Sequence, residues 1–180
     1  KYNFNLTITN HRKTKLGDFR AIQDKNQRHR ISVNGNLNKY SFLITLVHEI
    51  AHLVIWEKYK RKAKPHGAEW KAQFIVLMET FLFSGVFPPD IYSALNKHMK
   101  NPPASSISDI GLYKVLNNYN LNNSKVVYVE DIDENQNFAL FDGRQFKKIE
   151  KLRKRYKCIS LNNSRVYYLH PMLEVIPLNL

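Results

Sequence analysis

The sequence of 180 residues contains one cysteine, Cys158, and no stretch that approaches the ~20 consecutive apolar residues of a membrane-spanning helix. A single cysteine excludes an intramolecular disulfide and is typical of a reducing compartment. No signal peptide is visible, although the chain begins at Lys1 rather than at a methionine. We therefore expect a soluble cytoplasmic protein with no membrane partner.

Acidic residues are also scarce. The chain has 15 of them against 28 lysines and arginines, which gives a formal net charge of +13. Such an excess indicates a polyanionic partner, because basic side chains attract phosphates and release their counterions. The alternative is a generally basic surface whose lysines only contact solvent. The densest basic cluster, expected on a loop or strand edge that faces phosphates, consists of Lys147, Lys148, Lys151, Arg153, Lys154, Arg155 and Lys157.

The most informative motif is the run from His48 to His52, HEIAH. Residues 41–60 are predicted to form a helix with Ser41 as its N-cap, so that the two histidines lie one turn apart on one face. Two imidazoles at this spacing can bind one zinc ion, while Glu49 acts as the general base toward water activated by the metal. The alternative is a core helix whose histidines find ordinary hydrogen-bond partners.

A third protein ligand would leave zinc with one open position, as in catalytic zinc sites. His66 is the preferred candidate, because Gly67 permits a tight turn and a neutral imidazole suits zinc. Glu69 and Glu79 are alternatives of the kind found in sites with a glutamate ligand. An ordinary loop position for His66 also stays open at this point.

The segment from His48 to Trp70, HEIAHLVIWEKYKRKAKPHGAEW, resembles the centre of the SprT-like metallopeptidases, the family that includes the eukaryotic protease Spartan. The shared pattern is an H-E-x-x-H helix, a connector, a His-Gly pair and an aromatic residue. The resemblance implies one zinc ion, endopeptidase activity on protein substrates and, for the best-known members, cleavage of proteins crosslinked to DNA. It makes His48, His52 and His66 the metal ligands and Glu49 the catalytic base.

The expected fold is α+β, with a zincin-like catalytic domain over residues 1–100 and a linker over 101–111. The domain would combine a small antiparallel sheet with the H-E-x-x-H helix and two following helices, the last of which carries His98 on its surface. Alternating patterns predict strands over 3–10, 17–23 and 29–33, and helical spacing predicts helices over 68–83 and 88–99.

Residues 112–180 are predicted to form a small antiparallel β module of four or five strands. Segments 121–129 and 161–169 are near copies, each an Asn-Asn-Ser turn followed by β-branched and aromatic residues. Residues 138–143 indicate a further strand that ends in an Asp-Gly turn. Because Cys158 is the only cysteine, the zinc ribbon found in many bacterial relatives is excluded, and a buried structural thiol is expected instead.

Three functions remain open from the sequence. The first is a DNA-associated zinc endopeptidase, which acts on DNA-bound or DNA-crosslinked proteins, with single-stranded or damaged DNA as its partner and an association with the nucleoid. The second is a cytosolic metallopeptidase without a DNA partner. The third is a non-catalytic nucleic-acid-binding protein with a structural zinc site, which the intact Glu49 disfavours because such a site needs no base. The sequence assigns neither an oligomeric state nor a residue that stabilises the oxyanion.

Overall fold

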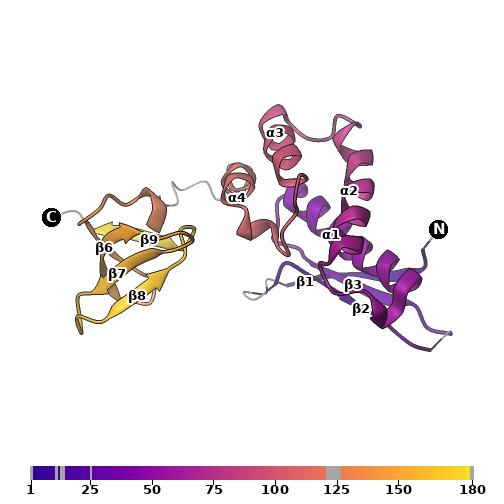
Figure 1. Cartoon of the computed structure of the whole chain (residues 1–180), viewed down its shortest axis with the longest axis horizontal. Helices are drawn as coiled ribbons and strands as arrows, with labels where there is room; N and C mark the ends of the chain where they lie inside the picture. Colours follow the sequence, from indigo (N-terminus) through magenta and orange to yellow (C-terminus); the bar gives the residue numbers. More distant parts are fainter. Residues whose placement is uncertain (1, 11, 13–14, 25, 121–126, 179–180) are drawn as a thin grey trace. The chain divides into compact units, whose positions relative to one another are not determined.

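The computed structural model describes residues 2–10, 12, 15–24, 26–120 and 127–178, and the chain divides into two compact units, Lys1–Leu121 and Asn122–Leu180 (Figure 1). The first unit contains β1 (Phe4–Thr9), β2 (Gly17–Arg20), β3 (His29–Asn34), α1 (Lys39–Tyr59), η1 (Lys60–Lys62), α2 (Ala68–Leu82), α3 (Pro89–His98), η2 (Ser106–Ser108) and α4 (Ile110–Asn117). The second contains β4 (Val127–Tyr128), η3 (Val129–Asp131), β5 (Asn137–Ala139), β6 (Gln145–Lys151), β7 (Tyr156–Ser160), β8 (Val166–Leu169) and β9 (Glu174–Leu178). No helix in these described ranges is long and apolar enough to cross a membrane.

The sheet of the first unit has the strand order β1-β3-β2. β2 is antiparallel to β3, but β1 is parallel to it, so the expectation of an all-antiparallel sheet was wrong for β1. The connection from β1 to β3 is long enough to contain β2. It therefore acts as a crossover, which allows β1 and β3 to run in the same direction. The sheet packs on α1 where Ile31 and Val33 meet Leu53.

The central helix α1 begins two residues earlier than predicted. Its N-cap is Asn38 rather than Ser41, because the Asn38 carboxamide oxygen accepts hydrogen bonds from the backbone N–H groups of Tyr40 (3.1 Å) and Ser41 (2.9 Å). The helix is apolar on nearly every side because the sheet contacts one face and α2 another. It is therefore the rigid element on which both motif histidines stand.

The helices of the first unit share one core, in which α2 contributes Trp70, Phe74 and Met78. α2 and α3 end within one residue of their predicted ends. Figure 1 shows α2, α3 and α4 on the side of α1 away from the sheet. The sheet and these helices thus enclose α1 between two layers.

His98 is buried, with 4% of its surface exposed, so its predicted surface position was wrong. Its Nδ1 lies 2.9 Å from Oδ2 of Asp109, whose other oxygen caps α4 by accepting from the N–H of Leu112. The charge pattern of a helix end favours a histidine there, but it does not reveal that a later helix covers it.

The segment predicted as a linker, 101–111, contains η2 and the start of α4 and belongs to the first unit. Asn38 ties α4 to the start of α1, because its Nδ2 donates to the carbonyl oxygen of Leu116 at 2.8 Å. The division between the units therefore follows Leu121, later than the boundaries drawn from composition. Two serines of this stretch, Ser106 and Ser108, belong to η2 and not to a linker.

The second unit is a six-stranded sheet of order β4-β9-β5-β6-β7-β8, in which all paired strands are antiparallel. The antiparallel arrangement is as expected, with more strands than the four or five predicted. Cys158 is fully buried in its core beside Phe146, as a structural thiol would be. Of the two near copies, 161–169 forms a turn and β8, whereas residues 121–126 of the other lie outside the described residues.

Candidate metal-dependent active site

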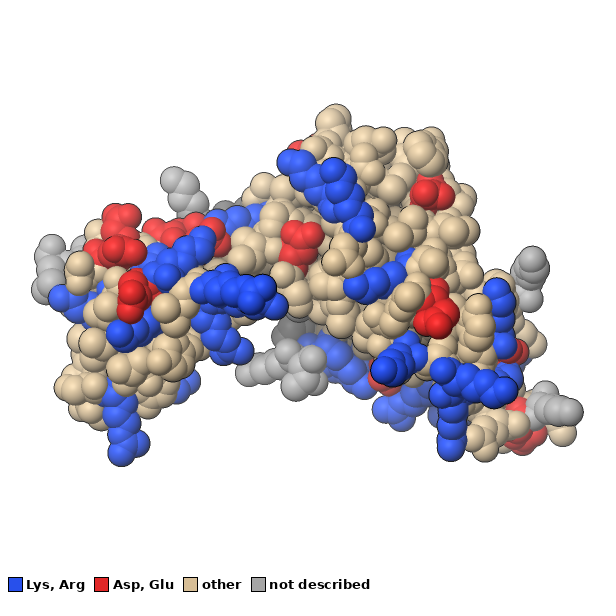
Figure 2. Space-filling view, in the orientation of Figure 1, with Lys and Arg blue, Asp and Glu red and all other residues tan. Residues whose placement is uncertain are grey.

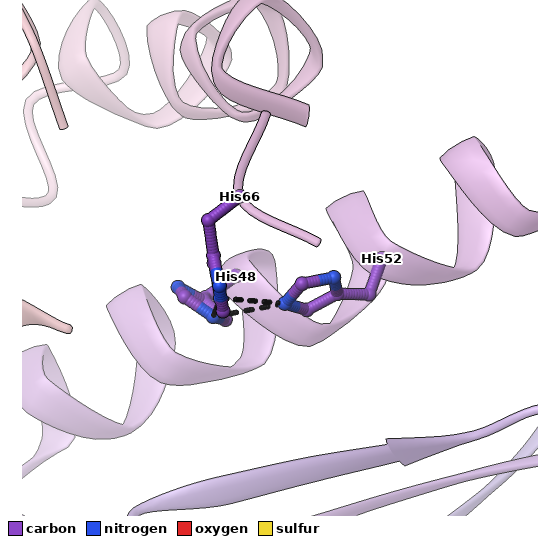
Figure 3. A group of neighbouring side chains, drawn as sticks. All are labelled: His48, His52 and His66. Atoms are coloured by element: carbon purple, nitrogen blue, oxygen red, sulfur yellow. Dashed lines mark hydrogen bonds between the residues drawn. The ribbon is translucent and has the colours of Figure 1, made fainter. Parts of the chain in front are cut away.

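Three histidines from two parts of the first unit point to one place (Figure 3). His48 and His52 stand on α1, and His66 reaches back from the connector between η1 and α2. Their Nε2 atoms lie 3.1 Å (His48–His66), 3.2 Å (His48–His52) and 3.0 Å (His52–His66) apart. Within the described part of the chain, this is the one cluster of three potential metal ligands, and neither Glu69 nor Glu79 belongs to it.

The geometry of the cluster fits a zinc ion. Two nitrogens bound to one tetrahedral zinc at ~2.0–2.1 Å lie about 3.3 Å from each other. The three observed separations, 3.0 to 3.2 Å, are close to that value. Three imidazole nitrogens that face one centre cannot satisfy one another by hydrogen bonds alone, since a neutral ring carries a single N–H. One cation at the centre satisfies all three lone pairs.

The protonation of the histidines agrees with this fit. Burial, reinforced by the neighbouring histidines, lowers the pKa of His48 to about 3. Burial and the proximity of His66 lower the pKa of His52 to about 4, and burial also lowers the pKa of His66. The rings are therefore neutral at pH 7, which is the form that binds a metal.

The backbone at His66 and Gly67 sets the position of the third candidate ligand, the His66 ring. His66 has a left-handed backbone, with φ of 57°, a conformation that costs a non-glycine residue about 1–2 kcal/mol and is stored strain at the site. Gly67 is the N-cap of α2, and its N–H donates to the carbonyl oxygen of Lys64 at 3.0 Å. An added Cβ at Gly67 would lie only 3.0 Å from that same oxygen. The turn directs the His66 ring toward α1.

Trp70 packs against all three histidines. Its ring centroid lies 4.5 Å from that of His48, 5.2 Å from that of His52 and 4.8 Å from that of His66, and Phe74 stacks on it at 5.0 Å. The Trp70 side chain is fully buried, and its Nε1 has no hydrogen-bond partner among the described residues. The indole fixes the orientation of the imidazoles through packing.

Glu49 lies beside the cluster in a tight environment formed by β2. Its side chain is 6% exposed and accepts a backbone hydrogen bond from Phe19. Burial, followed by the nearby charge of Asp18, raises the pKa of Glu49 to about 7. A Cβ on Gly17 would lie 2.5 Å from Oε1 of Glu49, so the close approach requires glycine. A carboxyl group with a pKa near 7 can both accept and release a proton at neutral pH.

A cavity of about 530 Å³ contains these groups. Its walls are β2 and the residues before it, α1, the connector that carries His66, the start of α2, and His98 with residues 104–106. The sequence did not indicate the contributions of β2 and His98. Gly17 inside a strand was the one available signal, because such a glycine often marks a close backbone approach.

The basic cluster of the second unit lies on β6, β7 and the turn between them. Lys148 is an exception to its expected role, since it is 4% exposed and its Nζ donates to the carbonyl oxygens of Glu130 and Ile132 above the Tyr156 ring. Strand alternation directs it into the core, so it is not available to phosphates. The remaining members, half-buried or exposed, are Lys147, Lys151, Arg153, Lys154, Arg155 and Lys157. Figure 2 shows basic side chains on both units.

Comparison with known proteins identifies one family. The sequence model of the SprT-like family matches residues 2–93, which include the three histidines and Glu49. No curated protein and no solved structure matches the chain. The match ends before His98, so the part of the cavity wall formed by His98 and residues 104–106 lies outside the match.

Proposed function

The chain belongs to the SprT-like family, a family of metallopeptidase-like proteins, and on this premise we propose that it is a zinc-dependent endopeptidase that cleaves DNA-bound or DNA-crosslinked proteins. The observation that carries the proposal is the convergence of His48, His52 and His66 next to a buried Glu49 in one cavity. A zincin-like fold for the first unit is part of the proposal, supported by the H-E-x-x-H helix packed under a sheet.

The histidines would hold the zinc ion, which when bound supplies Lewis acidity toward water and the peptide carbonyl. Glu49 accepts the proton of the attacking water at its carboxylate and passes it to the leaving amine. The hydrogen bond from Phe19 fixes the direction of this carboxylate. Glu49 is 6% exposed, which limits the contact of its carboxylate with bulk water, and Trp70 packs against the rings of the three histidines.

The edge of strand β2 is a candidate binding site for an extended substrate. Among the described residues it pairs only with β3, and its residues Gly17 to Phe19 line the cavity that contains Glu49. A peptide in the β conformation can add to such an edge through backbone hydrogen bonds, which bind without demanding a particular side chain. This arrangement favours flexible or unfolded protein segments as substrates.

Support for the DNA partner comes from charge. The net charge of +13 and the exposed basic residues Arg153, Lys154 and Arg155 on the second unit favour a polyanion. We place the activity in the cytoplasm and at the nucleoid, because the proposed substrates are attached to DNA.

The experiment measures cleavage of a DNA-binding protein by zinc-loaded enzyme, with and without single-stranded DNA, at several salt concentrations. The Glu49→Gln variant serves as the blank. We expect cleavage that DNA stimulates, that salt weakens and that the variant lacks. Cleavage independent of DNA and salt would remove the DNA partner and leave a metallopeptidase. No cleavage by a protein shown to hold zinc would contradict the proposed activity.

A further inference from the structure

A second cavity, of about 1070 Å³, adjoins the active-site cavity. Trp56 and Lys60 line both, so the two cavities share a wall at the end of α1. The remaining walls are the residues before β1, the loop between β2 and β3, the last turns of α1, and η1. Its size is slightly above the ~300–1,000 Å³ range of pockets that bind drug-sized molecules, so it has room for a larger ligand. We call it the η1 groove.

Three cations in the η1 groove have no counterion among the described residues. Arg28, Arg61 and Lys62 are exposed, and none forms an ion pair or a side-chain hydrogen bond with a described residue. They come from two separate parts of the chain, the loop before β3 and η1, and meet at one groove. Cations that converge without partners leave a positive potential that attracts an anion.

The acidic residues of the groove are already engaged. Glu57 lies 2.5 Å from Nε2 of His29 and 3.3 Å from Nζ of Lys60. Asp24 accepts hydrogen bonds from the backbone N–H of Asn26 at 2.9 Å and from the Gln27 side chain at 3.1 Å. Neither carboxylate forms a described ion pair with Arg28, Arg61 or Lys62. The described lining has more basic than acidic side chains, because Lys60 joins these three against Asp24 and Glu57, so its net charge is positive.

The groove also presents aromatic surface. Trp56 is half-buried, and Tyr2, which also lines the groove, is 40% exposed. Lys60 lies 5.9 Å from the centroid of the Trp56 ring, which places a cation beside an aromatic face. Aromatic faces with adjacent cations bind unpaired bases and their phosphates together, whatever the sequence.

A helix end explains only part of this charge. Cations near the C-terminus of α1 stabilise its dipole, and Lys58 and Lys60 suffice for that effect. Arg28 is on a different element, and Arg61 and Lys62 lie beyond the helix end, where the dipole interaction has weakened. The helix dipole therefore does not account for Arg28, Arg61 and Lys62.

We propose that the η1 groove binds a short segment of single-stranded nucleic acid, with its phosphates on Arg28, Arg61 and Lys62 and a base on Trp56. This proposal adds a DNA-binding site to the proposed function, and the biological role of that site depends on the proposed function. Because Trp56 and Lys60 also line the active-site cavity, a strand in the groove holds an attached protein next to Glu49. The catalytic unit then contacts nucleic acid directly, in addition to any contact by the second unit.

The experiment titrates the full-length protein with a fluorescein-labelled oligothymidine of 15 nucleotides and records its anisotropy at several salt concentrations. The test variant is Arg61→Gln/Lys62→Gln. The matched control is Lys97→Gln/Lys100→Gln, which removes the same charge from exposed positions of the same unit outside the groove. We expect the test variant to bind at least about tenfold more weakly and to reduce the salt slope by about 1.4, since each phosphate contact contributes about 0.7. The control keeps wild-type affinity apart from a small general charge effect.

Tryptophan fluorescence gives an independent readout, because the chain has two tryptophans and Trp70 is fully buried. Oligothymidine should quench the emission of the wild type, and Trp56→Phe should lose the quenching. Its circular dichroism and melting temperature show whether the variant is folded.

Three results would overturn the proposal that the η1 groove binds single-stranded nucleic acid. The first is equal affinity of the test and control variants for the oligonucleotide, and the second is quenching that persists in Trp56→Phe. The third is displacement of the labelled oligonucleotide by polyglutamate or duplex DNA as effectively as by unlabelled oligothymidine. A loss of binding only in Arg153→Gln/Lys154→Gln would move the site to the second unit. If the wild type does not bind oligothymidine, the proposed nucleic-acid site and the proposed DNA partner are both refuted. Zinc binding and cleavage of DNA-free protein then still test the peptidase activity. If the wild type binds oligothymidine but cleaves no protein, the peptidase activity is refuted and the nucleic-acid site in the η1 groove is retained.

Discussion

Gly17→Ala is a sensitive test of the proposed role of Glu49, because it adds one methyl group at the point where β2 meets the base. The new Cβ would lie 2.5 Å from Oε1 and 2.9 Å from Cγ of Glu49, and 2.7 Å from Cγ2 of Thr45. Normal van der Waals contact begins near 3.4 Å, so the carboxylate must move by about 0.9 Å. A displacement of this size at a reacting group costs about 100-fold in rate, and the overpacking costs about 1–3 kcal/mol of stability.

The assay measures kcat on a protein substrate together with zinc content and the melting temperature. We expect kcat to fall about 100-fold while one zinc per chain remains, because the clash does not involve the histidine rings. Gly111→Ala is the control, since the nearest atom to its added Cβ is Oδ1 of Asp109 at an ordinary 3.5 Å. Wild-type kcat in a folded Gly17→Ala protein would refute the placement of the base against β2.

Three further predictions follow from the same contacts. His66→Ala should weaken zinc binding by more than about 100-fold in a competition titration, since loss of a ligand's outer partner already costs about 10- to 100-fold; affinity like that of the wild type would exclude His66 as a ligand. Burial raises the pKa of Cys158 from 9.0 to about 11, so a thiol reagent at pH 8 should react about 100-fold more slowly with the native than with the urea-unfolded protein. Because the folded pKa is the higher one, the associated stability is complete below pH 9 and is lost as the pH rises toward 11; a stability of the second unit that is constant over this range would contradict it. Asp109→Ala should lower the free energy of unfolding of the first unit by about 1–3 kcal/mol in urea, because α4 loses its cap and buried His98 its partner, and Asp109→Asn should lose less.

The sequence predicted β1 to β3 and α1 to α3 closely, because their signals are local, but it did not predict α4. The spacing of His48 and His52 fixes their common helix face, and the turn at Gly67 precedes a clear helical stripe. The resemblance to the SprT-like family was confirmed by the match over residues 2–93. The expectation of a buried Cys158 also agrees with the structure.

The errors arose where distant segments meet. Composition marked 101–111 as a linker, but α4 is held by Asn38, more than seventy residues earlier in the chain. His98 was expected at the surface because no local pattern reveals the cover supplied by Asp109 and α4. The parallel pairing of β1 depends on a crossover, which strand patterns do not encode. Lys148 showed that a dense basic run can include a strand position that faces the core.

The η1 groove is also formed by segments that are distant in the sequence. Its basic residues were visible in the sequence as two separate groups, one before residue 30 and one after residue 58. Only the fold brings Arg28 to Arg61 and Lys62 and places Trp56 between this groove and the active site. Charge counts indicate a class of partner, and tertiary structure is needed to locate it.

The most direct test of the central claim compares zinc content and peptide-bond cleavage in the same preparations of wild type and Glu49→Gln. The account predicts one zinc ion per chain in both proteins and cleavage by the wild type alone, because the three histidines hold the metal and Glu49 transfers the proton. Equal cleavage by both proteins, or a wild type that cleaves after its zinc has been removed and shown to be absent, would contradict it.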